Sequence, residues 1–323
     1  MDASVRTSPR SGVRLERFKS KYLKPQTLTS VLWVIVRAII LLGLCYIILY
    51  PFFIKIINAF KTYSDFIDPT VRFLPKNFTL DNIKHVINEM NYWTTLRNTV
   101  VICLILSPLQ TLVCAVTGYG FARFRFKLRG ICFFLVIFSL IVPSQTILLP
   151  LYLKFKTFLG VFNLIGTPWP LVIMSLTGLG IKNGLYIFMF RQFFRNMPKE
   201  LEEAALIDGC GSFKTFTSVM LPNVKPAIVT VLVFSVVWYW NNYYEASMFL
   251  MDKQTLSVSL TMLNGMLDIT AGSISSITSQ ELMLMRDGVL ECGCILVMLP
   301  LLVMYIILQK QFTESVERTG IVG

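Results

Sequence analysis

Residues 200–211 read ELEEAALIDGCG, a short acidic stretch rich in small residues that lies between two long apolar runs. Four of its first nine residues are acids, whereas the whole chain of 323 residues is 54% hydrophobic and 15% charged. A soluble domain carries about 25% charged residues. The stretch is therefore a polar insertion in a membrane-type sequence, which predicts that it lies at a membrane surface.

Six apolar runs surround this insertion, and each is long enough to cross a bilayer core, which needs about 20 helical residues. They are residues 31–57, 98–121, 130–151, 166–190, 227–250 and 288–308. Lys182 and Asn183 interrupt the fourth run. The runs are continuous, whereas strands of a membrane barrel alternate polar and apolar residues. We predict an all-α integral membrane protein with six transmembrane helices.

The basic residues are unevenly distributed along the chain. Seven lie before residue 25, and the segment RFRFKLR (123–129) after the second run contains no acid. The first run is too long for a signal peptide and lacks a small-residue cleavage site. The positive-inside rule then predicts that both termini are cytoplasmic. A basic tail beside anionic lipid also accounts for the net charge of +12 without a nucleic-acid partner.

Sequence signals for chemistry are few. The chain has one histidine, His85, and no phosphate-binding loop, G-x-S-x-G or H-E-x-x-H pattern. Its seven cysteines show neither zinc spacing nor a disulfide framework. We therefore expect no catalytic, metal or nucleotide site. Prolines inside the runs, at Pro108, Pro143 and Pro300, predict the bent or broken helices that are common in transporters.

The wider segment 196–227 predicts a helix, a glycine turn and a second helix. Pro198 suits a first turn, and the glutamates after it complement the positive end of the helix dipole. Gly209 and Gly211 suit a left-handed cap. Ser212 suits the cap of the second helix, which the Leu-Pro pair at 221–222 closes.

The spacing within this segment is specific. It reads E-A-A, three residues, G, nine residues, Val, one residue, L-P, with the defined positions at Glu203, Ala204, Ala205, Gly209, Val219, Leu221 and Pro222. It closely resembles the EAA motif of the membrane subunits of ATP-binding-cassette importers, in which Ile stands where this chain has Val219. Seven positions at fixed spacing over twenty residues make the resemblance strong.

The resemblance extends over roughly residues 30–323. The segments VPSQTILLPLYLKFK (142–156), FRQFFRNMPKELEEAA (190–205) and FTESVERTGIVG (312–323) resemble the carbohydrate-uptake, MalG-like branch of these permeases. It implies a MetI-like bundle at about 94–308 with a cytoplasmic coupling helix near 198–212. The remaining parts are then a basic tail (1–28), a first transmembrane helix with an external loop (29–93) and a cytoplasmic C-terminal tail (309–323).

The resemblance also implies a function and partners. Such a permease imports a sugar or oligosaccharide through the bacterial cytoplasmic membrane, paired with a second homologous permease, two ATPase subunits and an external sugar-binding protein. ATP and Mg²⁺ bind the ATPases, and this chain binds no cofactor. The implied ATPase-coupling residues are Glu203, Ala204, Ala205, Leu206, Asp208, Gly209, Leu221 and Pro222. The sugar's length and charge are left open.

A substrate path is suggested by the fifth run, which contains VVWYWNNYYEAS (236–247). Aromatic rings stack on sugar rings, and amides or carboxylates bind hydroxyls. An interfacial aromatic belt explains the tryptophans and tyrosines but not the neighbouring polar groups. At helical spacing one face carries Trp238, Asn241, Asn242 and Glu245. Two further intramembrane charges, Lys182 and Glu291, join them as candidates.

Two other classes of protein compete with the importer hypothesis. An ion-coupled secondary carrier predicts two structural repeats and a titratable relay in mid-membrane, and no convincing repeat is present. A membrane-embedded enzyme predicts a cluster of acids or histidines at one face, which is absent. The outer segment 251–287, with DITAGSISSITSQ at its centre, is longer than a bare connection and is left as either a short helix or a mobile loop.

Overall fold

The computed structural model describes residues 25–71, 73–272 and 279–320. The predicted basic tail up to residue 24, the centre of the outer segment at 273–278 and the last three residues of the C-terminal tail lie outside the described residues. The chain divides into one unit at 1–57 and a second at 58–323, which are treated separately.

The first unit contains a single described helix, α2 (Pro25–Ala59), whose last two residues belong to the second unit. Its apolar side chains from Val31 onward are largely exposed. Pro51 lies inside the helix without ending it. A helix of this length and composition is long enough to cross a bilayer, which confirms the helix predicted for the first run.

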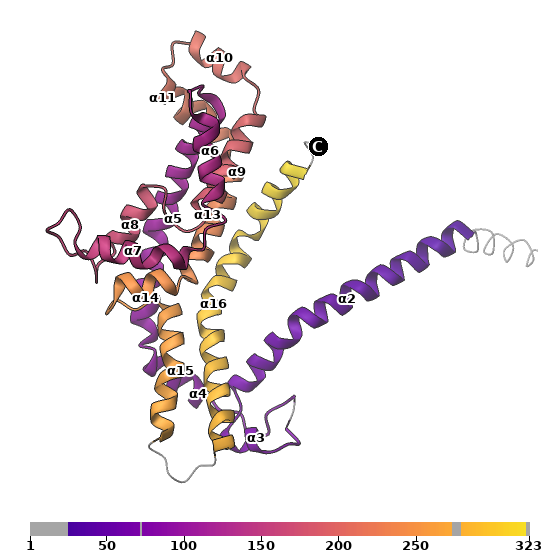
Figure 1. Cartoon of the computed structure of the whole chain (residues 1–323). Helices are drawn as coiled ribbons and strands as arrows, with labels where there is room; N and C mark the ends of the chain where they lie inside the picture. Colours follow the sequence, from indigo (N-terminus) through magenta and orange to yellow (C-terminus); the bar gives the residue numbers. More distant parts are fainter. Residues whose placement is uncertain (1–24, 72, 273–278, 321–323) are drawn as a thin grey trace, which may run out of the picture. The chain divides into compact units, whose positions relative to one another are not determined.

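The second unit is helical throughout its regular parts (Figure 1). The elements are α3 (Tyr63–Ile67), α4 (Asp81–Glu89), α5 (Tyr92–Arg123), α6 (Arg129–Phe138), α7 (Ser144–Lys156), α8 (Trp169–Leu176), α9 (Asn183–Asn196), α10 (Glu200–Ile207), α11 (Ser212–Thr215), the π-helix η1 (Phe216–Met220), α12 (Leu221–Asn223), α13 (Lys225–Trp240), α14 (Tyr244–Leu250), α15 (Leu256–Gly272) and α16 (Ser279–Gly320). Within the described residues β-pairing is limited to two isolated bridges.

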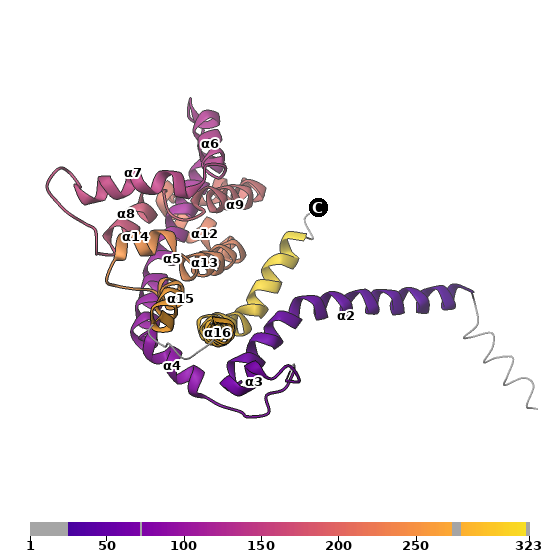
Figure 2. The same ribbon diagram turned by 60° about the horizontal axis from the view of Figure 1, so that its bottom comes forward.

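Helix α5 is the central element of this unit, and both α9 and α13 pack along it (Figure 2). The contact with α9 is very close at Gly118, where a Cβ atom would lie 2.6 Å from the Cβ of Phe190. Small residues allow helix backbones to approach in this way. Because both helices are long, this contact joins them along one side of the bundle.

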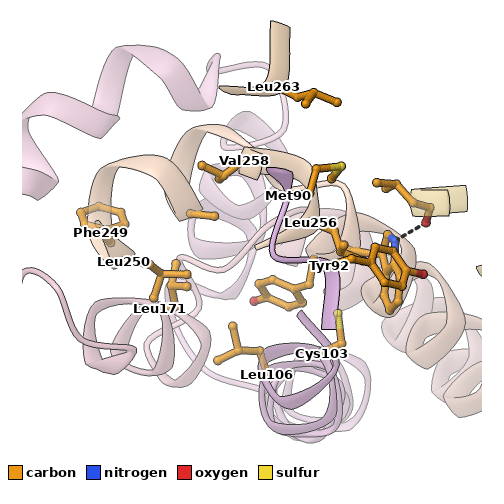
Figure 3. Packing of buried hydrophobic residues seen from close by; sticks show 14 of the residues in the cluster. Met90, Tyr92, Cys103, Leu106, Leu171, Phe249, Leu250, Leu256, Val258 and Leu263 are labelled. Atoms are coloured by element: carbon orange, nitrogen blue, oxygen red, sulfur yellow. Dashed lines mark hydrogen bonds between the residues drawn. The ribbon is translucent and has the colours of Figure 1, made fainter. Parts of the chain in front are cut away.

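Two hydrophobic clusters stabilise the unit. One gathers at the end where α10 lies and includes Tyr119, Phe190, Phe194 and Phe216. The other lies toward the start of α5, and Figure 3 shows its side chains on α5, α8, α14 and α15 together with Met90, which follows α4. Its labelled members are Met90, Tyr92, Cys103, Leu106, Leu171, Phe249, Leu250, Leu256, Val258 and Leu263.

Three helices of the described residues are long and apolar enough to span a membrane: Ser30–Ala59, Tyr92–Arg123 and Arg286–Gln309. A fourth is obtained only if Ser212–Asn223 and Lys225–Trp240, which meet at a bend of 79°, are counted as one span. The first, second and sixth apolar runs therefore lie in single helices. The count of six spans stays a prediction.

The other three runs are not single helices, and two of the breaks lie where the sequence indicated an interruption, at Pro143 and at Lys182. Pro108 and Pro300, by contrast, lie inside α5 and α16, which continue past them. The run 130–151 breaks between α6 and α7, where Pro143 precedes α7 and disfavours helix at the residue before it. The run 166–190 starts in a loop and breaks at 177–182, where Gly178 has φ 80°. The run 227–250 breaks between the end of α13 at Trp240 and the start of α14 at Tyr244.

The outer segment 251–287 contains more helix than predicted. Helix α15 accounts for 17 of its residues, and α16 begins at Ser279. Helix α16 packs against α3 and α4 near its start, and it runs from there toward the end of the unit that carries α10 (Figure 1). Helix α4 leads directly into α5, so α5 and α16 both start beside α4. The two helices therefore run in the same general direction (Figure 1).

Candidate functional site

Helix α10 lies at one end of the second unit, beyond the ends of α5 and α9 (Figure 1). Its first turn contains three glutamates at a helix N-terminus, where negative charge is stabilised by the helix dipole. Glu200 and Glu203 are exposed, whereas Glu202 and Ala205 are turned toward the bundle. The helix therefore has an acidic outer face and an inner face that packs on its own chain.

The turn after α10 is the one predicted from the sequence at Gly209. This residue has φ 75°, and its amide donates to the Leu206 carbonyl at 3.0 Å. The Cys210 amide donates to the Ala205 carbonyl at 2.9 Å. These two bonds form a Schellman motif, which satisfies the last carbonyls of the helix. Gly211 has φ −69°, so its predicted left-handed conformation is wrong.

The second helix of the motif starts differently from the prediction. Gly211 occupies the cap position, Ser212 is already helical, and no side chain caps the helix. The chain then continues without interruption through η1 into α12, so Pro222 follows a turn of helix and lacks an amide that a helix interior would use. The second helical segment ends at Asn223, one residue after the Leu-Pro pair, and meets α13 at a bend of 79°, so the predicted helix end at this pair is confirmed to within one residue.

The predicted coupling residues fall into two groups. Those that are exposed are Glu203, Ala204, Leu206, Asp208, Gly209 and Pro222, while Leu221 is half-buried and Ala205 is buried within this chain. Leu206 and two further apolar side chains extend outward, with exposed fractions of 58% for Leu206, 86% for Ile207 and 80% for Phe213. Exposed apolar groups next to an acidic face are typical of a protein-binding surface.

The predicted path residues are only partly brought together. The Lys182 ammonium lies 4.8 Å from the centre of the Trp238 ring, close enough for a cation–π contact. Lys182 has φ 60° and lies at the start of α9, and both side chains are exposed. They come from the break between α8 and α9 and from the end of α13.

The remaining path residues lie elsewhere. Asn242 donates to the buried Glu245 carboxylate at 3.1 Å, and Asn241 donates to the carbonyl of Val237 at 2.9 Å. The predicted single face of Trp238, Asn241, Asn242 and Glu245 is wrong, because the helix breaks between the first and the last of them. Glu291 on α16 accepts a hydrogen bond from Asn58 at 2.7 Å.

A buried polar network, which the sequence analysis did not predict, lies behind Lys182. Gln110 on α5 is fully buried, and its amide donates to the Ile181 carbonyl at 2.5 Å and to the Asn183 side chain. Ser235 on α13 donates to the Gln110 carbonyl oxygen at 3.0 Å. These bonds connect α5 and α13 to the break between α8 and α9. A glutamine beside a proline inside an apolar run was the available signal.

Sequence reasoning also missed Arg123, the last residue of α5. Its guanidinium donates to the Met197 carbonyl at 2.8 Å, and its Nε lies 3.5 Å from an oxygen of the Glu202 carboxylate. In sequence it belongs to the basic segment 123–129 and carries no separate signal.

The sequence of residues 114–318 matches the family described as "Binding-protein-dependent transport system inner membrane component". This match covers more than half of the chain. The chain belongs to this family. It is thus a membrane permease component of a binding-protein-dependent transport system, and the predicted relation to ABC importer permeases is confirmed.

Individual relatives support the same conclusion. The chain is 27% identical over 285 residues to the maltodextrin transport system permease protein MalD of Streptococcus pneumoniae, covering 87% of this chain and 92% of MalD. It is 26% identical over 284 residues to the arabinooligosaccharides transport system permease protein AraQ of Halalkalibacterium halodurans, covering 87% and 93%.

Among solved structures, a bacterial ABC transporter involved in the import of the acidic polysaccharide alginate contains a chain with the same fold. The TM-score is 0.68 at 19% identity, over 88% of this chain and 98% of that one. At this identity the likeness describes the fold. The permease architecture assigned from the sequence is therefore supported in three dimensions.

Proposed function

We propose that this permease imports a sugar or oligosaccharide and that α10 is the helix through which partner ATPases drive it. The observation that carries the proposal is the outer surface of α10–α11, with exposed Glu203 beside exposed Leu206, Ile207 and Phe213. A short acidic helix with outward apolar groups suits a cleft on another protein. The sugar follows from the relatives named for maltodextrin and arabinooligosaccharide transport.

The orientation in the membrane is supported by the position of the basic segment 123–129. It follows the end of α5, and the contact of Arg123 with Glu202 places that end beside α10. Basic loops favour the cytoplasmic side. In this proposal α10 faces the cytoplasm, α16 runs toward the same side, and both termini are cytoplasmic in a six-span protein of the bacterial inner membrane.

The partners follow from the family and from what the chain offers. A second homologous permease pairs with this one, two ATPases that hold ATP and Mg²⁺ dock on the coupling helices, and an external binding protein delivers the sugar. This chain then holds no cofactor and catalyses no reaction. Membrane lipid surrounds the exposed apolar side chains of α2 and the outer face of α5.

For the sugar path we propose the contact of Lys182 with Trp238. Helices α9 and α13 have 14 and 16 residues, so each is about 20–25 Å long. Both residues lie at or near the ends of these helices away from α10, so with the α10 end at the cytoplasmic face they lie about 5–10 Å inside the opposite face of a core about 30 Å thick. An exposed ammonium at that depth is costly unless it faces water or protein, which favours a position on the path.

Co-expression of the chain with its neighbouring transporter genes tests the proposal. A tag on this chain is expected to co-purify an ATPase, and Glu203→Lys is expected to reduce that recovery and the ATPase rate in proteoliposomes. Glu89→Lys, an equal charge reversal at an exposed position at the end of α4, is the matched control. A chain that purifies alone and transports sugar without ATP would overturn the proposal and favour an ion-coupled carrier.

A further inference from the structure

The joint between α9 and α10 is bridged by a residue of a third helix. Arg123, at the end of α5, donates to the carbonyl of Met197, which ends α9, and faces Glu202 on the inner side of α10. Its two contacts therefore lie at the first residue of the short connection 197–199 and beyond its end, on α10. The guanidinium presents donors in a fixed fork, which suits one side chain to hold two acceptors at once.

The contact with Glu202 is sheltered from water. The exposed fractions of the two side chains are 8% for Arg123 and 19% for Glu202. The facing atoms, Arg123 Nε and one Glu202 carboxylate oxygen, are buried and make no hydrogen bond. A sheltered ion pair is screened less by salt than a surface pair, and removal of one partner leaves the other charge buried and uncompensated.

The elements on the bundle side of this bridge are packed as one body. Gly118 allows α5 to contact α9 at Phe190 with no room for a Cβ atom. Tyr119 on α5 also packs against Phe194 on α9, with ring centres 5.3 Å apart, and against Phe216 on η1 at 5.0 Å. A displacement that reaches Arg123 is thus passed to α5 and α9 together.

We propose that Arg123 and Glu202 are positioning residues that hold α10 at a fixed angle to α5 and α9, so that a push on α10 moves both helices as a unit. The proposal rests on the proposed function, in which ATPases push on α10. It divides the acidic turn between two tasks: Glu203 faces the partner, and Glu202 faces inward to the bundle. Without the bridge, α10 can still bind a partner but turns about the connection 197–199.

The test measures the distance between α10 and α5 in the assembled transporter. Spin labels are placed at Glu200 and Val116, both exposed, through an unnatural amino acid because the chain has seven native cysteines. Distances are recorded in proteoliposomes without nucleotide and after trapping with MgATP and vanadate. In the otherwise unchanged chain the distance is expected to stay constant on trapping.

The bridge is then weakened by Glu202→Gln, which keeps the size of the side chain, and by Arg123→Gln. Arg125→Gln, an equal charge change at an exposed position two residues along, is the control. In the bridge variants the distance is expected to change on trapping by about 2 Å, the size of common helix shifts, while ATPase still co-purifies and hydrolyses ATP. The aromatic contacts of Tyr119 keep the helices packed in these variants.

The outcomes separate the two proposals. If an ATPase co-purifies and hydrolyses ATP but the distance stays constant on trapping in Glu202→Gln and Arg123→Gln, as in the control, the positioning role is overturned and the proposed function stands. If no ATPase co-purifies with the unchanged chain, the proposed function fails and the positioning role fails with it.

Discussion

Two turns of this molecule end a helix in the same local way, but only one of them also depends on a distant side chain. The turn after α10 and the break between α8 and α9 both contain a glycine in the left-handed region, Gly209 with φ 75° and Gly178 with φ 80°. At Gly209 and at Gly178 alike, the last carbonyls of the preceding helix are satisfied by amides a few residues away, at Gly178 by the Leu179 amide on the Met174 carbonyl at 2.9 Å. At the break the Ile181 carbonyl is satisfied by Gln110, 71 residues earlier in the chain.

The two turns differ in how much of the chain is needed to specify their conformation. A local motif is recognisable from a handful of consecutive residues, because donor and acceptor lie close together in sequence. A break held by a distant side chain depends on how helices pack. The turn at Gly209 is therefore expected to keep its conformation when residues elsewhere in the bundle are changed. The break near Lys182 depends on contacts with side chains of α5 and α13.

The largest expected effect tests that dependence. Gln110→Leu keeps an approximate size but leaves the Ile181 carbonyl, Asn183 and Ser235 without their partner. Because buried unpaired polar groups are costly, we expect a loss of about 3 kcal/mol in the free energy of unfolding. Thermal unfolding in detergent measures it, with Gln145→Leu at an exposed position of α7 as the control. Equal midpoints for both variants would contradict the role of Gln110.

The next prediction concerns the close packing between α5 and α9 at Gly118. In Gly118→Ala the new Cβ would lie 2.6 Å from the Phe190 Cβ and 3.0 Å from the Arg191 backbone nitrogen. Overpacking of this kind costs about 2 kcal/mol. Gly120→Ala meets nothing within 4 Å and should be neutral or stabilise the helix by up to about 1 kcal/mol. Midpoints that shift alike would show that the helices are not in close contact.

The local turn is expected to respond more weakly. Gly209→Ala meets no neighbouring atom, so its cost comes from the positive φ alone and is about 1 kcal/mol. Amide hydrogen exchange over residues 200–215 should then be about five-fold faster. Gly211→Ala, at φ −69° and equally unobstructed, should leave exchange slower or unchanged. If exchange accelerates equally in both variants, the left-handed conformation of Gly209 does not stabilise α10.

The smallest effect is expected at an exposed local turn, Asp68-Pro69-Thr70. The Lys76 ammonium, followed by the hydroxyl and amide of Thr70, donates to Asp68 and holds the pKa of its carboxyl well below the usual 3.8. A depressed pKa gives stability that is present above pH 3.8 and is lost as pH falls through the lower folded value. Exchange of the Thr70 amide should therefore stay protected at pH 4. In Asp68→Asn that protection should not vary with pH, and equal pH profiles for both chains would refute the assignment.

The residues of the candidate site show the same difference between local and distant partners. The sequence predicted α10 and its Gly209 turn, because proline, glutamates, alanines and glycine act through neighbouring backbone groups. It placed Lys182 and Trp238 together as candidates without showing that they touch. It missed Arg123, whose partners lie 74 and 79 residues away, since nothing in a basic segment distinguishes an inward-facing arginine from one in water.

By itself the sequence determined that this is a helical membrane protein, because long apolar runs are stable in lipid and costly in water. The fixed spacing of the motif at 203–222 determined its resemblance to importer permeases, because that spacing is read from consecutive residues. It also determined where the first, second and sixth runs form single helices. Pro143 and the Lys182-Asn183 pair already indicated interruptions of the third and fourth runs. Only the tertiary structure decided that the fifth run breaks after Trp240, that Trp238 and Glu245 do not share a face, and that Glu202 faces inward. These features depend on side chains such as Gln110 and Arg123 reaching backbone groups of distant segments, and only packing determines which segments they reach.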